Sequence, residues 1–183
     1  MEAYLTAHGA SRWSGLIFGA ELKSAKAWSM FFGRLALGFL FLWSASQKIL
    51  TELTGKMATE AFLAGPGVHS SPFALFFHGL AGNPIVEGLL VYGELAIGIS
   101  LIFGVLTRVG SVAGALQILL FTLALWPIAD RLGDNPLVDY RVIYGVLFLM
   151  FFFLRPGQFL GVDGIVSRSK LVKRFPRLNW LLG

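Results

Sequence analysis

From Val91 to Gly110 the chain reads VYGELAIGISLIFGVLTRVG, a stretch apolar enough to cross a membrane, yet it carries Glu94 in its interior and Arg108 near its end. A carboxylate inside hydrocarbon costs about 2.5–3.5 kcal/mol on insertion scales. A partner charge, a proton or a polar cavity must compensate for this cost. The surroundings of Glu94 are therefore the first question that the sequence raises.

Composition places the chain among integral membrane proteins. Of its 183 residues, 56% are hydrophobic without counting the 22 glycines, whereas soluble domains have about 45–50% apolar residues with glycine included. The net charge is +5, but no basic helix interleaved with aromatic residues indicates nucleic-acid binding. The chain has no cysteine, which excludes disulfides, thiol redox chemistry and cysteine-ligated metals within it. None of the three histidines lies in a predicted span, so we expect no haem held by two histidines and no metal site.

Apolar blocks of about 20 residues, long enough to cross a bilayer of roughly 30 Å, recur along the chain. The predicted spans are 28–50, 85–106, 109–128 and 137–154. Between the first two spans, we expect short interfacial helices over residues 52–63 and 73–80, separated by the Gly- and Pro-rich loop 64–72. Consecutive spans joined in this way most simply form a bundle. The predicted fold is an all-α, integral membrane four-helix bundle with short interfacial helices in the first outer loop.

The distribution of Lys and Arg predicts the orientation of this bundle. Segment 1–27 has three such residues and segment 155–183 has six, whereas the two long loops have one each. Cytoplasmic segments carry the excess of Lys and Arg in membrane proteins. We therefore expect a multi-pass protein of the cell membrane with both termini in the cytoplasm, including a basic tail over residues 155–183.

Several polar residues are predicted to meet in the outer half of the bundle. Lys48 shares a stripe of the first span with small residues, so this stripe is expected to face the interior. Glu94 lies about 10 Å deeper than Glu87 at 1.5 Å per residue, and Tyr144 follows Arg141 by roughly one helical turn. The functional interpretation is a polar pocket that opens outward, lined by Glu94, Lys48, Arg141 and Tyr144.

Simpler structural roles stay open for the polar residues of the spans. Charges near helix ends commonly reach the lipid head groups, and an amide in a span can bond a neighbouring helix. Glu94 can also form a purely structural ion pair with Arg141 or with Lys48. His69 and His78 are open either to an ordinary loop role or to a role as ligands or proton carriers. The residues predicted to be structural polar groups are Arg34, Glu87, Arg108, Gln117 and Asp139.

Three motifs resemble the DoxX/DoxD family. They are Arg34…Gly38…Phe41…Lys48 in the first span, Glu94-x-x-x-Gly98-x-x-Leu101-x-x-Gly104 followed by Arg108 in the second, and Pro156–Gly157…Gly161–Val162–Asp163 after the last. The resemblance covers residues 31–163. The chain length and the long first outer loop are most similar to the DoxD branch, the small membrane subunit of thiosulfate:quinone oxidoreductase.

This resemblance implies oxidation of thiosulfate to tetrathionate on the outer face, with electrons passed to a membrane quinone and with a DoxA-like second subunit. No tightly bound cofactor is expected in this chain. Because a sulfur dianion needs cations, the predicted substrate-binding residues are Lys48, Arg141 and His69. The predicted catalytic residues are Glu94 and Tyr144, since a quinone needs a proton donor near its carbonyls and a buried carboxyl can carry protons.

Two other functions stay open. The chain can be a non-catalytic structural subunit of a terminal quinol oxidase or another respiratory complex, with its charges paired internally and its lipid-facing surface docked on a larger partner. It can also be a small transporter or channel with Glu94 as its gate. We rank the transporter last because the sequence contains no visible half-helix or inverted repeat.

Overall fold

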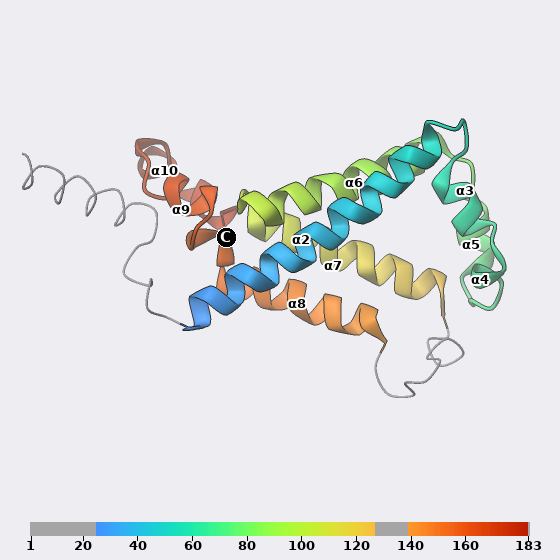
Figure 1. Ribbon diagram of the computed structural model, residues 1–183, viewed down its shortest axis with the longest axis horizontal. Helices are drawn as coiled ribbons and strands as arrows, with labels where there is room; N and C mark the ends of the chain where they lie inside the picture. Colours follow the sequence, from blue (N-terminus) through green and yellow to red (C-terminus); the bar gives the residue numbers. More distant parts are fainter. Residues whose placement is uncertain (1–24, 127–138, 183) are drawn as a thin grey trace, which may run out of the picture.

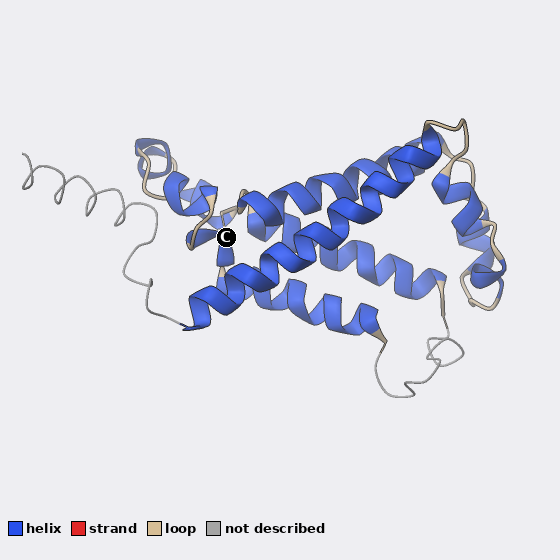
Figure 2. Ribbon diagram, viewed as in Figure 1, coloured by secondary structure: helices blue, strands red, loops and turns tan. Residues whose placement is uncertain are grey.

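The computed structural model describes residues 25–126 and 139–182, and every regular element in these two ranges is helical (Figure 2). Most of the predicted segment 1–27 therefore lies outside the described residues. The long helices are α2 (Ala25–Glu52), α6 (Pro84–Phe103), α7 (Thr107–Ala124) and α8 (Tyr140–Leu154) (Figure 1). The short elements are α3 (Ala58–Leu63), α4 (Pro66–His69), α5 (Ala74–His78), η3 (Pro156–Gln158), α9 (Val162–Val166), α10 (Lys170–Arg174) and η4 (Pro176–Trp180).

Helices α2, α6 and α7 are each long and apolar enough to cross a membrane, which indicates a membrane protein. Helix α8 is also apolar but has 15 residues, so it extends about 22 Å at 1.5 Å per residue, short of the roughly 30 Å hydrocarbon core. The predicted fourth span starts at residue 137, and the described helix α8 starts at Tyr140 with Asp139 as its N-cap, whose carboxylate accepts from the Arg141 backbone N–H at 2.8 Å. Residues 137 and 138 lie outside the described ranges.

The turn between α6 and α7 differs from the predicted boundaries at 106 and 109. Helix α6 ends at Phe103 because Gly104 adopts a left-handed conformation with φ of 64°, which glycine tolerates without strain. Helix α7 then starts at Thr107, where the Asp163 carboxylate accepts backbone N–H groups from Leu106 at 2.7 Å and from Thr107 at 2.9 Å. A cap supplied from more than fifty residues away leaves no local signal in the sequence.

The long helices pack in the order α2–α6–α7–α8, with the most extensive contact between α2 and α6. Small residues permit this close approach. A Cβ atom at Gly98 would lie 2.9 Å from the backbone nitrogen of Leu42, and one at Gly38 would lie 3.1 Å from the backbone nitrogen of Ile102. The predicted interior stripe of the first span is buried at Arg34, Gly38, Phe41 and Ala45.

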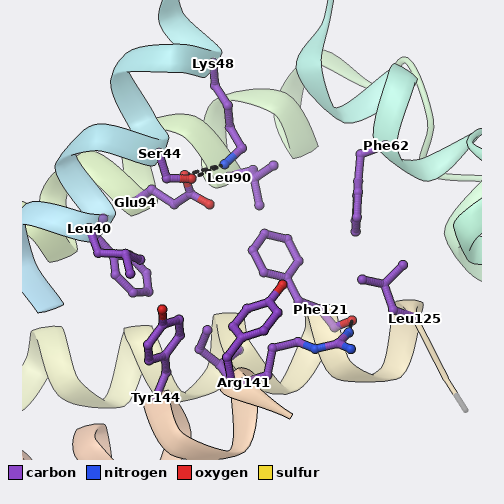
Figure 3. A pocket seen from close by; sticks show the side chains of 13 residues that line it. Leu40, Ser44, Lys48, Phe62, Leu90, Glu94, Phe121, Leu125, Arg141 and Tyr144 are labelled. Atoms are coloured by element: carbon purple, nitrogen blue, oxygen red, sulfur yellow. Dashed lines mark hydrogen bonds and ion pairs between the residues drawn. The ribbon is translucent and has the colours of Figure 1, made fainter. Parts of the chain in front are cut away.

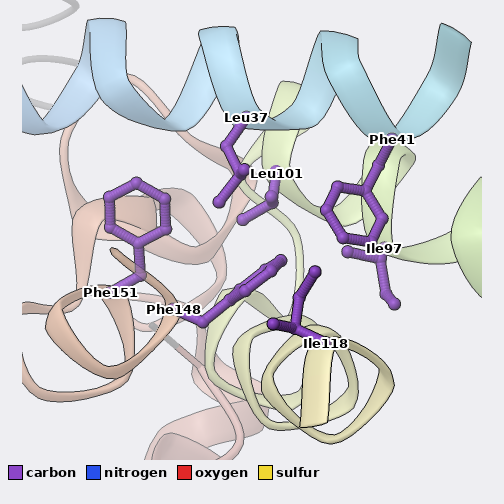
Figure 4. Packing of buried hydrophobic residues seen from close by; sticks show 7 residues of the cluster. All are labelled: Leu37, Phe41, Ile97, Leu101, Ile118, Phe148 and Phe151. Atoms are coloured by element: carbon purple, nitrogen blue, oxygen red, sulfur yellow. The ribbon is translucent and has the colours of Figure 1, made fainter. Parts of the chain in front are cut away.

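An apolar cluster joins the four long helices at mid-height. Phe41 on α2 packs edge to face against Phe148 on α8, with ring centroids 5.3 Å apart. Helices α2 and α8 share a far smaller contact than the other neighbouring pairs, and they diverge toward the end that carries α3–α5 (Figure 1). The cluster thus holds α2 and α8 together at mid-height, and the two helices separate from there toward α3–α5. Its members are Leu37, Phe41, Ile97, Leu101, Ile118, Phe148 and Phe151 (Figure 4).

At the end where α6 turns into α7, buried side chains fasten backbone segments together. Arg34 donates from its two terminal nitrogens to the carbonyl oxygens of Pro156 and Leu160, each at 3.1 Å. Arg108 donates to the Phe152 carbonyl oxygen at 3.2 Å and lies over the Phe152 ring. Arg34 therefore holds the chain that follows α8 against α2, and Arg108 holds the last turn of α8 against α7.

At the opposite end, α3–α5 cover the tips of α6 and α7. The Glu87 carboxylate of α6 accepts the Ala58 and Thr59 backbone N–H groups, each at 2.8 Å, and also the Thr59 hydroxyl. It thereby supplies the N-terminal cap that α3 lacks, since Met57 provides no side-chain bond there. The Ser71 hydroxyl donates to the Leu123 carbonyl oxygen of α7 at 2.7 Å. The predicted short helices exist, but 52–63 divides between the end of α2 and α3, and the predicted loop 64–72 contains α4.

Candidate functional site

A cavity of about 260 Å³ lies toward the end of the structure that carries α3–α5, and side chains of α2, α3, α6, α7 and α8 line it. This volume is near the lower end of the ~300–1,000 Å³ found for small-molecule pockets. Tyr140, which contributes to the wall, is 58% exposed, so the cavity reaches the surface of the described structure. The lining residues are Leu40, Phe41, Ser44, Lys48, Phe62, Leu90, Glu94, Ile118, Phe121, Leu125, Tyr140, Arg141 and Tyr144 (Figure 3).

Glu94 forms the polar wall of this cavity and is only 2% exposed. One carboxylate oxygen lies 2.5 Å from the Lys48 ammonium nitrogen, and the other accepts from the Gln117 side-chain amide at 2.9 Å. Lys48 also donates to the Ser44 hydroxyl at 2.8 Å. Of the two ion pairs considered for Glu94, the structure contains the one with Lys48. The intramembrane carboxylate is thus compensated from both neighbouring helices, α2 and α7.

Arg141 lies on the α8 wall and is paired with Asp139 instead of Glu94. Its Nε donates to Asp139 Oδ1 at 2.7 Å and its Nη2 donates to Oδ2 at 2.9 Å. Such a two-bond geometry is among the strongest side-chain pairings. The same carboxylate caps the first turn of α8, so Asp139 fixes both the helix start and the direction of the arginine.

Tyr144 projects from α8 into the cavity, and its hydroxyl points toward the wall formed by α2 and α6 (Figure 3). No other group among the described residues forms a hydrogen bond with this hydroxyl, and the ring packs against Tyr140 with centroids 5.5 Å apart. The hydroxyl is therefore free to donate to a molecule in the cavity. Of the four residues predicted to share an outward pocket, all line this one.

His69 is the predicted site residue that does not line the cavity. It is exposed at the end of α4, with its ring 4.6 Å from that of His78 and its Nδ1 3.1 Å from the Gly65 carbonyl oxygen. A substrate-binding role for His69 stays a prediction, and it requires a site on the outer surface of α3–α5.

Three residues that line the cavity were not predicted from the sequence: Ser44, Phe62 and Phe121. The sequence did contain a signal for Ser44, because it lies one turn before Lys48 on the same face of α2. Phe62 and Phe121 carried none, since their edge-to-face contact at 5.5 Å joins α3 to α7 only in the folded chain. Phe62 and Phe121 together line the cavity with aromatic surface.

The arrangement can bind a flat apolar molecule with polar groups at opposite edges. The Glu94–Lys48 pair offers a proton and a charge on one wall, and the Tyr144 hydroxyl offers a donor on the opposite wall. Apolar side chains such as Leu40, Leu90 and Phe121 lie between them. Among residues 25–126 and 139–182, no three metal-binding side chains come together.

Comparisons of this chain with models of protein families, with curated proteins and with solved structures find no match.

Proposed function

We propose that the chain is the quinone-reducing membrane subunit of a thiosulfate:quinone oxidoreductase of the DoxX/DoxD type. In this proposal α8 is the fourth span of a four-helix bundle in the cell membrane, with both termini cytoplasmic. The observation that carries the proposal is the arrangement of the cavity walls. The Glu94–Lys48 pair lies on one wall, the Tyr144 hydroxyl, which has no hydrogen bond to the described residues, lies on the facing wall, and apolar side chains lie between them. The three motifs that resemble the family supply the choice of reductant.

A quinone head group is the ligand that fits these walls best. Its ring needs apolar surface, and its two carbonyl oxygens need a hydrogen-bond or proton donor at opposite edges, as Tyr144 and the Glu94–Lys48 pair provide. The cavity reaches the surface at Tyr140 of α8, and in this proposal the isoprenoid tail remains among the lipids while the head group enters. Each quinone takes up two electrons and two protons to become quinol.

Thiosulfate supplies the two electrons when two molecules join through a new sulfur–sulfur bond to form tetrathionate. The cations that line the cavity are Lys48 and Arg141, and each is already paired with a carboxylate. We therefore propose that a DoxA-like second subunit completes the thiosulfate site beside them. Electrons then pass from sulfur to the quinone bound in the cavity.

The test is thiosulfate-dependent reduction of a short-chain quinone analogue by membranes carrying the chain, with and without its partner subunit. Glu94→Gln is expected to abolish reduction while the protein remains folded. Glu60→Gln is the matched control, because Glu60 is exposed on α3 and does not line the cavity. Turnover at the wild-type rate in Glu94→Gln would remove Glu94 from the reaction.

A second candidate is a non-catalytic subunit of a terminal quinol oxidase or another respiratory complex. One observation favours it: both carboxylates near the cavity, Glu94 and Asp139, already have their charges compensated within the chain. In that case neutralising Glu94 would leave oxidase turnover intact and instead reduce the amount of complex that assembles. The ratio of assembled complex to turnover separates the two functions.

A further inference from the structure

The chain beyond Asp163 is strongly basic. Residues 164–183 contain five Lys and Arg side chains and no Asp or Glu. In α10, Lys170, Lys173 and Arg174 follow the i, i+3, i+4 spacing that places side chains on one helix face. All three are exposed, whereas Val172 on the same helix is buried. Helix α10 thus presents a cationic face outward.

This basic segment is fastened to the ends of the spans. The Arg108 guanidinium of α7 donates to the Trp180 carbonyl oxygen at 3.2 Å and lies over the adjacent rings of Phe152 and Trp180, at 4.7 and 5.5 Å from their centroids. The Asp163 carboxylate holds the start of the segment to the first turn of α7. Helices α9 and α10 accordingly lie at the end of the molecule opposite α3–α5 (Figure 1).

Aromatic side chains accompany the charges at this level. Phe175 and Trp180 are 53% and 59% exposed, and each is adjacent to basic residues in the sequence or in contact with one. Aromatic rings and Lys or Arg together are typical of segments at the membrane–water interface, where rings enter the head-group region and cations meet phosphates.

We propose that α10 and η4 form an interfacial site for anionic phospholipid head groups, with Lys170, Lys173, Arg174 and Arg177 as the phosphate-binding side chains. The positive charge of this segment is complementary to anionic phosphates, and no acidic side chain in the segment competes for its cations. One basic residue close to an anionic membrane surface contributes roughly fivefold to binding. The site requires only that this end of the spans lies at a membrane surface, so it is independent of the redox chemistry proposed above.

The test uses the full chain reconstituted into vesicles of phosphatidylcholine that carry trace spin-labelled phosphatidylglycerol or spin-labelled phosphatidylcholine. The measured quantity is the association of each probe with the protein surface. The wild type is expected to prefer the anionic probe by roughly fivefold, the contribution of one basic residue per bound head group. The preference should fall as salt rises, because the screening length shortens from about 10 Å at 0.1 M to about 3 Å at 1 M.

Two variants decide the outcome. K170Q/K173Q/R174Q/R177Q removes the charges and should bring the two probes to equal association, while K170R/K173R/R174K/R177K keeps the charges and should retain the preference. All four side chains are exposed, so neither variant should disturb the packed spans. The proposal would be overturned if the glutamine variant kept the full preference for the anionic probe. It would also be overturned if the charge-conserving variant lost this preference to the same extent as the glutamine variant. Neither result depends on quinone reduction.

Discussion

Replacing Lys48 by methionine should destabilise the folded protein by leaving a buried carboxylate with one partner. In the wild type, Glu94 is compensated by the Lys48 ammonium at 2.5 Å and by the Gln117 amide at 2.9 Å. Methionine keeps most of the apolar stem of lysine and removes the charge. The variant therefore isolates the ion pair from the packing of α2 against α6.

The size of the effect follows from the burial of the two partners. Removing one member of a fully buried ion pair costs about 3–5 kcal/mol, because the other charge is left without compensation. The Lys48 side chain is 21% exposed, so water already screens part of the interaction. We therefore expect Lys48→Met to lower the free energy of unfolding by about 2–3 kcal/mol.

The measurement is equilibrium unfolding of the purified protein in mixed micelles, with a denaturing detergent as titrant and helix content as signal. Lys56→Met serves as the control, because Lys56 is exposed and forms no ion pair within the described residues. In a double-mutant cycle, adding Glu94→Gln to Lys48→Met should recover at least 1 kcal/mol, roughly the size expected for contacting residues. A Lys48→Met variant within about 0.5 kcal/mol of the wild type, or a strictly additive double variant, would refute this reasoning.

Three further changes test other contacts of the fold. Gly98→Ala should lower the free energy of unfolding by about 1–3 kcal/mol through overpacking against α2, whereas Gly93→Ala, where a Cβ meets nothing within 4 Å, should be neutral or stabilising in the same detergent titration. Asp163→Asn should cost about 1–3 kcal/mol, because an amide cannot accept at both atoms from the α7 N-terminus. Glu87→Gln should loosen α3, because the Glu87 carboxylate accepts the first two N–H groups of that helix. In a protein that also carries Ser44→Cys, a water-soluble thiol reagent should then modify the cavity cysteine faster. An unchanged rate would show that α3 does not restrict access to the cavity.

The sequence predicted the features that depend on apolar runs and helical spacing. The helical class, three of the four predicted spans as long apolar helices, and the interior stripe through Arg34 and Phe41 follow from periods that a single segment carries. Lys48, Glu94, Arg141 and Tyr144 were expected to share a pocket because depth along a helix can be counted from the sequence, and all four line the cavity.

What the sequence could not provide is the identity of partners from distant segments. Glu94 had two candidate cations, and the choice of Lys48 depends on α2 packing more closely than α8 against α6. The sequence left Arg141 open to Glu94, but Asp139, two residues earlier, accepts from its Nε and Nη2, and its Nη1 donates to the Phe121 carbonyl oxygen at 3.5 Å. The start of α7 depends on Asp163, which lies beyond α8 in the chain. Each of these contacts is decided by packing between helices.

The polar groups of this protein fall into two kinds, and the difference indicates where ligand chemistry belongs. Arg34, Asp163 and Glu87 bond mainly to backbone atoms, so replacing their partners with a ligand would require helix ends to come apart. Lys48 and Glu94 bond to side chains at a cavity wall, and such side chains can exchange a partner for a ligand by rotating. A bound quinone or any other occupant should therefore shift the Lys48–Glu94 pair and leave the backbone-bonded groups unchanged. Hydrogen exchange that slows at the start of α7 as much as around the cavity when a quinone analogue binds would contradict this division.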